Sequence, residues 1–261
     1  MKPVLFHIGP FAVLSYGVIF VPALLLGLFI MWRLYKNNLS FLRYKVTLDS
    51  FFDSVLVFIF SFGVGARLLH IFEHFSFFSH NPLLWILFLH FPGFSLLGGI
   101  LGGMVGLWLF CRYQKQPFTL LLDIMVIGLS FVTAFSRIGS LLAGDSFGRE
   151  TTFPIRVALA ELPGLRHPTQ LYEALLFFVL FAFLYFLYQR GKTQKGEITL
   201  YFFILVGLIR FFIEMLRGDS VYLGKIAIAQ VISILFFVGA LGVLAYKKKS
   251  HLLGLFKRKT V

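Results

Sequence analysis

Three ionisable side chains stand at helical spacing inside an otherwise apolar stretch of the chain. Arg210, Glu214 and Arg217 recur at i, i+4 and i+7 among phenylalanine, isoleucine, leucine and methionine, so we expect them on one helix face. Each such residue costs at least about 2.5 kcal/mol inside a membrane and normally faces a partner or a cavity. Glu214 could neutralise one arginine and leave a positive charge for an anion. A structural network of salt bridges is the alternative.

Another arginine, Arg137, is followed by several glycines near the end of a second apolar segment. The string reads Ser136-Arg137-Ile138-Gly139-Ser140-Leu141-Leu142-Ala143-Gly144-Asp145-Ser146-Phe147-Gly148-Arg149. We expect a helix to end and a loop to begin here, and glycines let the backbone approach a ligand closely. The alternative is an arginine that snorkels to the membrane surface from a flexible turn.

A third string, His167-Pro168-Thr169-Gln170-Leu171-Tyr172-Glu173, opens a further apolar segment. Pro168 suits the first turn of a helix, and Gln170 and Glu173 face the same side because they are three residues apart. From the pattern alone, Tyr172 is favoured as an interfacial anchor and His167 as part of the helix cap.

Histidines at positions 70, 74 and 80 suggest a metal site, but only Glu73 joins them at a suitable spacing. Interfacial histidines are the favoured interpretation. The single cysteine, Cys111, excludes a disulfide framework and a cysteine-rich metal site. We therefore expect no bound metal and no other cofactor.

The composition determines which elements must position these residues. Of 261 residues, 59% are hydrophobic and 13% are charged, which is too little polar side chain to cover a soluble domain. A helix needs about 20 apolar residues to cross a bilayer, which leaves room for about seven. We predict an all-α polytopic membrane protein, with residues 1–261 forming a single bundle and residues 247–261 a basic cytoplasmic tail. The net charge of +13 does not indicate a nucleic-acid partner, because the basic residues lie at the ends of apolar segments.

The predicted membrane-spanning segments are Phe11–Met31, Phe51–Ile71, Leu83–Phe110, Phe118–Phe135, Leu171–Tyr188, Ile198–Leu216 and Ile226–Tyr246. The third is too long for one span, so we interpret Leu83–Phe91 as a re-entrant or interfacial piece before a helix from Phe94. Within that helix Gly98, Gly102 and Gly106 repeat every four residues, which allows close packing against a neighbouring helix.

Lysine and arginine indicate the orientation, because cytoplasmic loops hold an excess of them. With the N-terminus outside and the C-terminus inside, most of the 24 basic residues lie in the inner segments. Most of the others are arginines, whose forked guanidinium binds phosphate or carboxylate in a bidentate way. The outer side of the membrane therefore has the character of an anion-binding face.

Along nearly its whole length the sequence resembles the bacterial prolipoprotein diacylglyceryl transferases. The matching strings are Ile8-Gly9-Pro10, Ser15-Tyr16-Gly17, Gly65-Ala66-Arg67, Gly98-Gly99, Arg137-Ile138-Gly139, Gly144-Asp145 with Gly148, the string from His167 to Glu173, Arg210-Phe211-Phe212-Ile213-Glu214 with Arg217, and Gln230. The string from His167 to Glu173 is the most specific of them.

The resemblance implies a bacterial inner-membrane enzyme with seven helices, an outward N-terminus and an inward C-terminus. Its partners would be phosphatidylglycerol, the signal peptide of a prolipoprotein with its lipobox cysteine, and membrane lipids. The diacylglyceryl group would move to the cysteine thiol and release glycerol phosphate. Arg137 and Arg210 would be catalytic, binding the phosphate in one membrane-embedded cavity near the outer side, with Tyr16 on its wall and Glu214 balancing charge. The substrate- or lipid-binding residues implied are Tyr16, Arg67, Gly98, Gly99, Gly139, Ser140, Gly144, Asp145, Gly148, His167, Gln170, Tyr172, Glu173, Glu214 and Arg217.

The chain departs from the family pattern as a divergent member. Leu97 stands where the family has a histidine, Ser140 stands where it has asparagine, and the acid is Asp145 in place of glutamate. Leu97 cannot take a proton, but positive neighbours lower the pKa of a free thiol from about 8.5, so the arginines could activate the substrate. The alternative function is a non-catalytic lipid-binding or lipid-transport protein on the same scaffold, although the internal repeat of usual transporters is not found.

The orientation can be tested with reporter fusions. The loop from Arg190 to Lys195 and the tail after Tyr246 are lysine-rich and short, so both should lie inside. Fusions at Lys192 and after Lys249 should both report a cytoplasmic location. An outside signal at either position would overturn the predicted topology.

Overall fold

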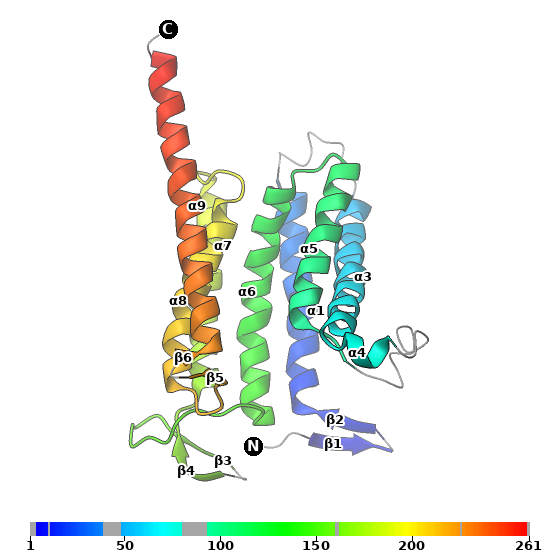
Figure 1. Cartoon of the computed structure of the whole chain (residues 1–261), viewed down its shortest axis with the longest axis vertical. Coiled ribbons are helices and arrows are strands. Elements are labelled where there is room, and N and C mark those ends of the chain that lie inside the picture. The colour runs from blue at the N-terminus through cyan, green and yellow to red at the C-terminus, as the bar shows by residue number, and fades with distance from the viewer. Residues whose placement is uncertain are drawn as a thin grey trace. The chain divides into compact units, whose positions relative to one another are not determined.

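Helices dominate the computed structural model, which describes residues 4–9, 11–38, 48–79, 93–159, 162–224 and 226–259. Within these residues, seven helices are long and apolar enough to cross a membrane (Figure 1). They are α1 (Ser15–Lys36), α3 (Leu48–Glu73), α5 (Leu96–Tyr113), α6 (Phe118–Ala143), α7 (Thr169–Arg190), α8 (Glu197–Leu216) and α9 (Ile228–Lys259). A single-turn helix, α4 (Phe75–Phe78), follows α3. The predicted all-α polytopic class is confirmed.

Three short antiparallel strand pairs accompany the helices. They are β1 (Val4–Ile8) with β2 (Phe11–Leu14), β3 (Val157–Leu159) with β4 (Leu162–Arg166), and β5 (Tyr222–Leu223) with β6 (Ile226–Ala227). The predicted helical start at Phe11 is therefore wrong, because Phe11–Leu14 pairs with β1 and the helix begins at Ser15. A short apolar run reads equally well as strand or helix. Gly9, with a φ of +58°, lies in the turn between the two strands.

The fourth predicted span ended too early. It was expected to end at Phe135, but α6 continues to Ala143 and therefore carries Arg137, Gly139 and Ser140 on its last turns. The helix ends at Gly144, whose φ is +73° and whose N–H donates to the Ser140 carbonyl at 2.8 Å. Glycine is favoured at this position because it enters the left-handed region without steric cost.

The third span begins at Leu96, after an extended Ser95, close to the expected start at Phe94. Leu83–Phe91 lies outside the described residues, so its re-entrant path stays a prediction. The chain divides into two compact units, one of residues Met1–Met31 with Leu122–Val261 and one of residues Trp32–Leu121. The single-bundle organisation also stays a prediction.

In the unit of residues 32–121, α3 and α5 pack backbone against backbone. A Cβ built on Gly65 would lie 2.4 Å from the Gly98 carbonyl oxygen and 2.7 Å from the Gly102 Cα. A Cβ on Gly98 would in turn lie 2.4 Å from the Gly65 carbonyl oxygen. The glycine repeat thus serves the close helix contact expected from the sequence.

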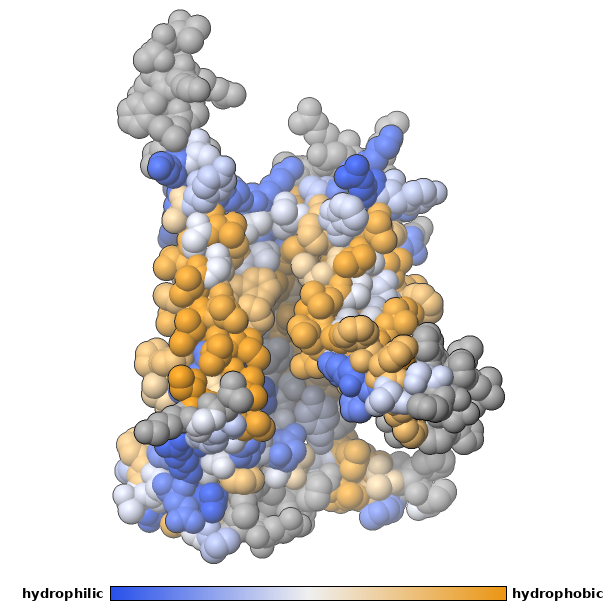
Figure 2. All heavy atoms as spheres, viewed as in Figure 1, coloured by the Kyte–Doolittle hydropathy of each residue, from blue (hydrophilic) through white to orange (hydrophobic). Residues whose placement is uncertain are grey.

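In the other unit, α7, α8 and α9 run alongside one another (Figure 1). Gly207 of α8 allows a close approach to α9, because a Cβ there would lie 2.7 Å from the Ser233 carbonyl oxygen. Hydrophobic side chains cover the outward face of α9, with hydrophilic residues above and below them (Figure 2). Leu235 and Val238 on this helix are among the exposed residues. Such a band is stable when lipid covers it.

The α3–α5 contact gives a matched pair of substitutions. Gly65→Ala should destabilise the protein by about 1–3 kcal/mol, because the new methyl group meets rigid backbone. Gly63→Ala, on the same helix, has nothing within 4 Å of its new Cβ and should be neutral or slightly stabilising. Thermal unfolding of the purified protein in detergent would measure both. Equal melting temperatures for the two variants would show that the helices do not pack through Gly65.

Candidate active site

A single buried carboxylate, that of Glu173, joins three helices. Pro168 caps α7, and the first turns of the helix bury both Gln170 and Glu173. The Oε2 atom of Glu173 forms an ion pair with Nε of Arg137 on α6 at 2.7 Å. Its Oε1 atom accepts from Nη1 of Arg210 on α8 at 2.6 Å. The structure thus brings together the two arginines that the sequence singled out.

The two arginines differ from their shared partner in exposure. The Glu173 side chain is 2% exposed, whereas those of Arg137 and Arg210 are each 26% exposed. The carboxylate therefore lies behind the guanidinium groups, and the accessible surface of the cluster is cationic. Among the described residues, the two terminal nitrogens of Arg137 donate no hydrogen bond, which leaves a forked donor edge for a ligand.

Glu214, which was expected from the sequence to balance the arginine charge, lies farther from the arginines than Glu173 does. Its buried Oε2 atom lies 3.7 Å from Nη2 of Arg210 and 3.9 Å from Nε of Arg217, beyond hydrogen-bond distance. It contributes negative charge between the two arginines without fixing either of them. The anchoring counter-ion is Glu173, which the sequence placed only among the binding residues.

The spacing predicted that Arg217 lies on the same helix face as Arg210 and Glu214. This prediction is wrong, because Arg217 lies outside the helix. The last residue of α8 is Leu216, and Arg217 is extended, with a φ of −75° and a ψ of 141°. Its guanidinium forms two hydrogen bonds to Asp219, at 2.9 and 2.8 Å. Burial acts to lower the pKa of Arg217, but the hydrogen bond and the charge of Asp219, with the charges of Glu173 and Glu214, raise it overall. Asp219 was missed because it lies beyond the last helical residue, where helical spacing does not indicate which side chains meet.

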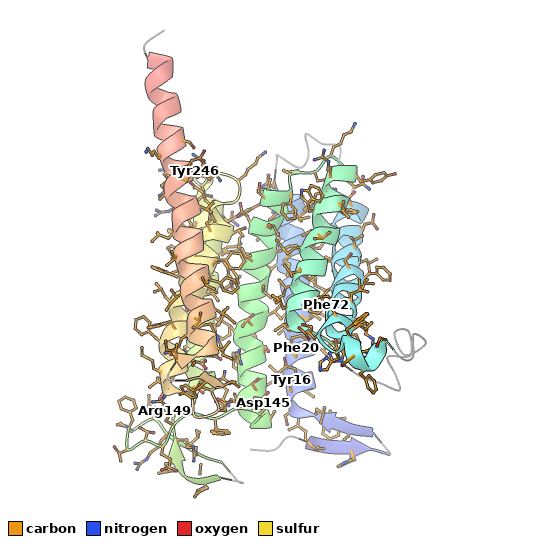
Figure 3. All side chains as sticks on the ribbon, in the orientation of Figure 1. Tyr16, Phe20, Phe72, Asp145, Arg149 and Tyr246 are labelled. Atoms are coloured by element: carbon orange, nitrogen blue, oxygen red, sulfur yellow. The ribbon has the colours of Figure 1, made fainter. Side chains whose placement is uncertain are left out.

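Tyr16 lies beside the arginine-bearing turn of α6. Its hydroxyl and that of Ser136 are 2.9 Å apart, and a Cβ on Gly139 would lie 3.4 Å from the backbone of Tyr16. The first turn of α1 therefore packs against the face of α6 that carries Ser136 and Gly139, which flank Arg137 in the sequence. Figure 3 shows Tyr16 and Asp145 at the same end of these two helices.

The loop after α6 is tied to the neighbouring helix ends. Ser140 donates to Oδ2 of Asp145 at 3.0 Å, and the buried Gln170 amide donates to the Ser146 carbonyl. Gly148 has no room for a side chain, because a Cβ would lie 2.3 Å from the His167 carbonyl oxygen. These contacts give Ser140, Asp145, Gly148 and Gln170 a role in holding the loop.

The remaining residues of the third string also contact protein atoms. His167 Nδ1 lies 3.3 Å from the Tyr172 hydroxyl, which donates to the Ile155 carbonyl at 3.2 Å. Two arginines outside the predicted site support the same region. Arg166 donates to the Gly148 carbonyl at 3.2 Å, and Arg149 donates to the Tyr222 hydroxyl at 2.8 Å. In the sequence, only the position of Arg149 at the end of the glycine-containing string from Ser136 indicated a role for this residue.

Arg67, Gly98 and Gly99 belong to the other unit. Arg67 is buried on α3 and donates to the Gly93 carbonyl at 3.1 Å, while a Cβ on Gly99 would meet the Phe62 ring at 2.5 Å. Within that unit these three residues serve helix packing and local hydrogen bonding. A ligand-binding role for them stays a prediction.

The histidines of α3 come close together without showing a complete metal site. One ligand atom from each of His70, Glu73 and His74 lies within 4.8 Å of the others. Two of these residues already have protein partners, since Glu73 accepts from Ser95 at 3.0 Å and His74 Nδ1 lies 3.1 Å from the His70 carbonyl oxygen. His80 lies outside the described residues, and the expectation of no bound metal stays a prediction.

Two guanidinium groups held on one buried carboxylate have the geometry that a bound anion would need. Their charge is positioned before a ligand arrives, so no reorganisation is needed when negative charge develops there. The planar fork of arginine matches two oxygens of a phosphate group. The arrangement is suited to binding a phosphate ester and to stabilising a phosphate leaving group.

Comparison with known proteins agrees with this chemistry. The family model described as prolipoprotein diacylglyceryl transferase matches residues 3–246. A phosphatidylglycerol–prolipoprotein diacylglyceryl transferase of Limosilactobacillus reuteri is 31% identical, over 97% of this chain and 93% of the relative. Proteins of the same name from Clostridium botulinum strain Hall and Finegoldia magna are 32% and 28% identical, over 90% and 95% of this chain and 92% and 97% of the relatives. The chain therefore belongs to the prolipoprotein diacylglyceryl transferase family.

Proposed function

We propose that this protein transfers a diacylglyceryl group from phosphatidylglycerol to a cysteine thiol of a prolipoprotein. The observation that carries the proposal is the pair of partly exposed arginines, Arg137 and Arg210, held on the buried Glu173. The names of the relatives supply the substrates. The substrate cysteine is the lipobox cysteine of the signal peptide.

The reaction exchanges one bond for another. The thiolate sulfur bonds to the CH2 carbon of the diacylglyceryl group that carries the phosphate. The bond from that carbon to the phosphate oxygen breaks, and the oxygen keeps the electron pair as the headgroup departs as glycerol phosphate. Negative charge grows on the phosphate as this bond breaks. Arg137 and Arg210 stabilise that charge, and their effect is large because low-dielectric surroundings strengthen charge interactions.

The nucleophile belongs to the substrate. Cys111 is buried on α5 and is not required. Leu97, which replaces the histidine of the family pattern, has no group that can accept a proton. Positive neighbours favour the thiolate form of a cysteine, so the arginine pair lowers the pKa of the substrate thiol as well as binding the phosphate.

The proposed place of action is the outer side of the bacterial inner membrane. Arg137 lies on the last turns of α6 and Arg210 towards the end of α8. The lysine-rich loop of residues 191–196 lies at the other end of α7 and α8, and its positive charge supports a cytoplasmic location for that end. Membrane lipids cover the exposed apolar faces of the helices, with the N-terminus outside and the C-terminus inside.

A direct assay combines the purified protein with phosphatidylglycerol and a lipobox peptide. Mass spectrometry should show the cysteine of the peptide heavier by one diacylglyceryl group, and glycerol phosphate should appear in equal amount. A peptide with serine in place of cysteine serves as the control. Binding of phosphatidylglycerol without any mass added to the peptide would overturn the proposal and support a non-catalytic lipid-binding protein.

Substitutions of the paired arginines test the forked geometry. Arg210→Lys and Arg137→Lys keep the charge but lose the bidentate edge, so each should lower the transfer rate by about 10² to 10³. Arg156→Lys should leave the rate unchanged, since Arg156 is exposed and donates only a long hydrogen bond to the Thr152 carbonyl.

Leu97→Ala provides a further comparison in the same assay. Leu97 is 60% exposed and offers no proton-transfer group, so its loss should lower turnover only modestly. A near-normal Arg210→Lys together with an inactive Leu97→Ala would place the chemistry beside α5 instead.

A further inference from the structure

A second cationic pocket lies at the far end of α7 and α8 from Glu173. Its cavity has a volume of about 400 Å³ and is lined by Arg190, Lys192, Gln194, Glu197, Tyr201 and Lys248 among others. Glu173 stands in the second turn of α7 and Arg190 is its last residue. At 1.5 Å per residue the two ends are about 25 Å apart, so this pocket is separate from the arginine pair.

The positive charge of this pocket is not neutralised within it. Arg190, Lys192 and Lys248 form no ion pair with any carboxylate of the described residues. The one acid in the lining, Glu197, accepts from the Gln194 backbone N–H at 2.8 Å. An anion in the cavity would therefore meet cationic groups that have no other described ionic partner.

Hydrogen bonds from α6 and α9 hold the loop of residues 191–196, which forms part of the pocket. The buried carboxylate of Asp123 on α6 accepts from the backbone N–H groups of Gly196 and Thr199 at 2.5 and 2.8 Å, and from the Thr199 hydroxyl at 2.7 Å. Lys247 on α9 donates to the Lys195 carbonyl and ties that helix to the same loop. The pocket is therefore preformed, which lowers the entropic cost of binding.

The surroundings of the pocket select a lipid in preference to a free ion. The Arg190 guanidinium lies over the Phe186 ring at 4.1 Å, and the Lys248 amine lies over the Tyr201 ring at 5.9 Å. Basic side chains paired with aromatic rings at the ends of apolar helices are typical of the membrane interface. Phe186 is itself exposed on α7, so an acyl chain could lie along this face below a headgroup in the pocket.

We propose that this pocket binds the phosphate of an anionic phospholipid headgroup at the membrane surface opposite the transferase site. Basic pockets between transmembrane helices recognise such headgroups through charge and hydrogen bonding. The bound lipid would join α7, α8 and α9 at this end, since the pocket draws its cations from α7, from the loop before α8 and from α9.

The test uses the full chain in vesicles and a phosphatidylglycerol analogue with a photoreactive headgroup. After irradiation, mass spectrometry should find label on the peptide of residues 187–201. Lys192→Gln with Lys248→Gln should lower the affinity read from probe titration about 150-fold, because each lysine in the pocket would lose a charge-assisted hydrogen bond to the phosphate, worth about 1.5 kcal/mol. A phosphatidylcholine analogue should label this peptide far less, and equal labelling by both analogues would overturn the proposal.

A matched control separates the pocket from general surface charge. Lys195→Gln with Lys249→Gln removes the same charge from the same loop and helix, but neither side chain lines the cavity. Labelling should be unchanged in this control. A loss as large as in the pocket variant would mean diffuse attraction and would overturn the proposal.

A final arm distinguishes the two sources of phosphate. A large excess of inorganic phosphate, at constant ionic strength, should leave most of the label in place. Complete displacement would show that the pocket takes free phosphate, which would overturn the assignment to a lipid.

Discussion

A carboxylate buried among apolar helices must be paired, because an unpartnered charge there costs several kcal/mol. Glu173 meets this requirement with two arginines from two other helices. The same pairing fixes where α6 and α8 stand relative to the start of α7. Cationic surface then remains accessible in front of the acid, so one constraint produces both a structural junction and the cationic surface on which the proposed phosphate site depends.

The surrounding elements serve to keep this junction in place. The extension of α6 to Ala143 brings Arg137 to α7 on a helix and not on a mobile turn. The loop beyond it is fixed by Gln170 and by the close contact of Gly148 with His167. Arg217 and Asp219 neutralise each other just after α8. The buried Oε2 atom of the second acid, Glu214, lacks a hydrogen-bond partner among the described residues. Glu214 reduces the positive charge of Arg210 and Arg217 but does not neutralise both of them.

Much of the fold was predictable, because the need for long apolar helices in lipid leaves a direct trace in composition. The glycine repeat of α5 likewise predicted a close helix contact. The strand pairs were not predictable, since segments of two to five residues carry no clear period. The end of α6 was placed too early because polar residues from Ser136 onward interrupt the apolar run, although the helix continues to Ala143. At the candidate site, the residue types singled out Arg137, Arg210 and Glu173, which the structure shows in contact with one another. Their pairing depends on contacts between residues 36 and 37 positions apart, which spacing within one helix cannot reveal.

The central claim is that Glu173 acts through the arginines that it holds. A double-mutant cycle of transfer rates, with Glu173→Gln, Arg210→Lys and both together, tests it most directly, with folding checked by thermal unfolding. The account predicts strong non-additivity, because removing either member of a pair that acts as a unit already abolishes most of the contribution of the pair to the rate. The double variant should be little slower than the slower single variant. Rate losses that multiply in the double variant would contradict the account, because Glu173 and Arg210 would then act independently.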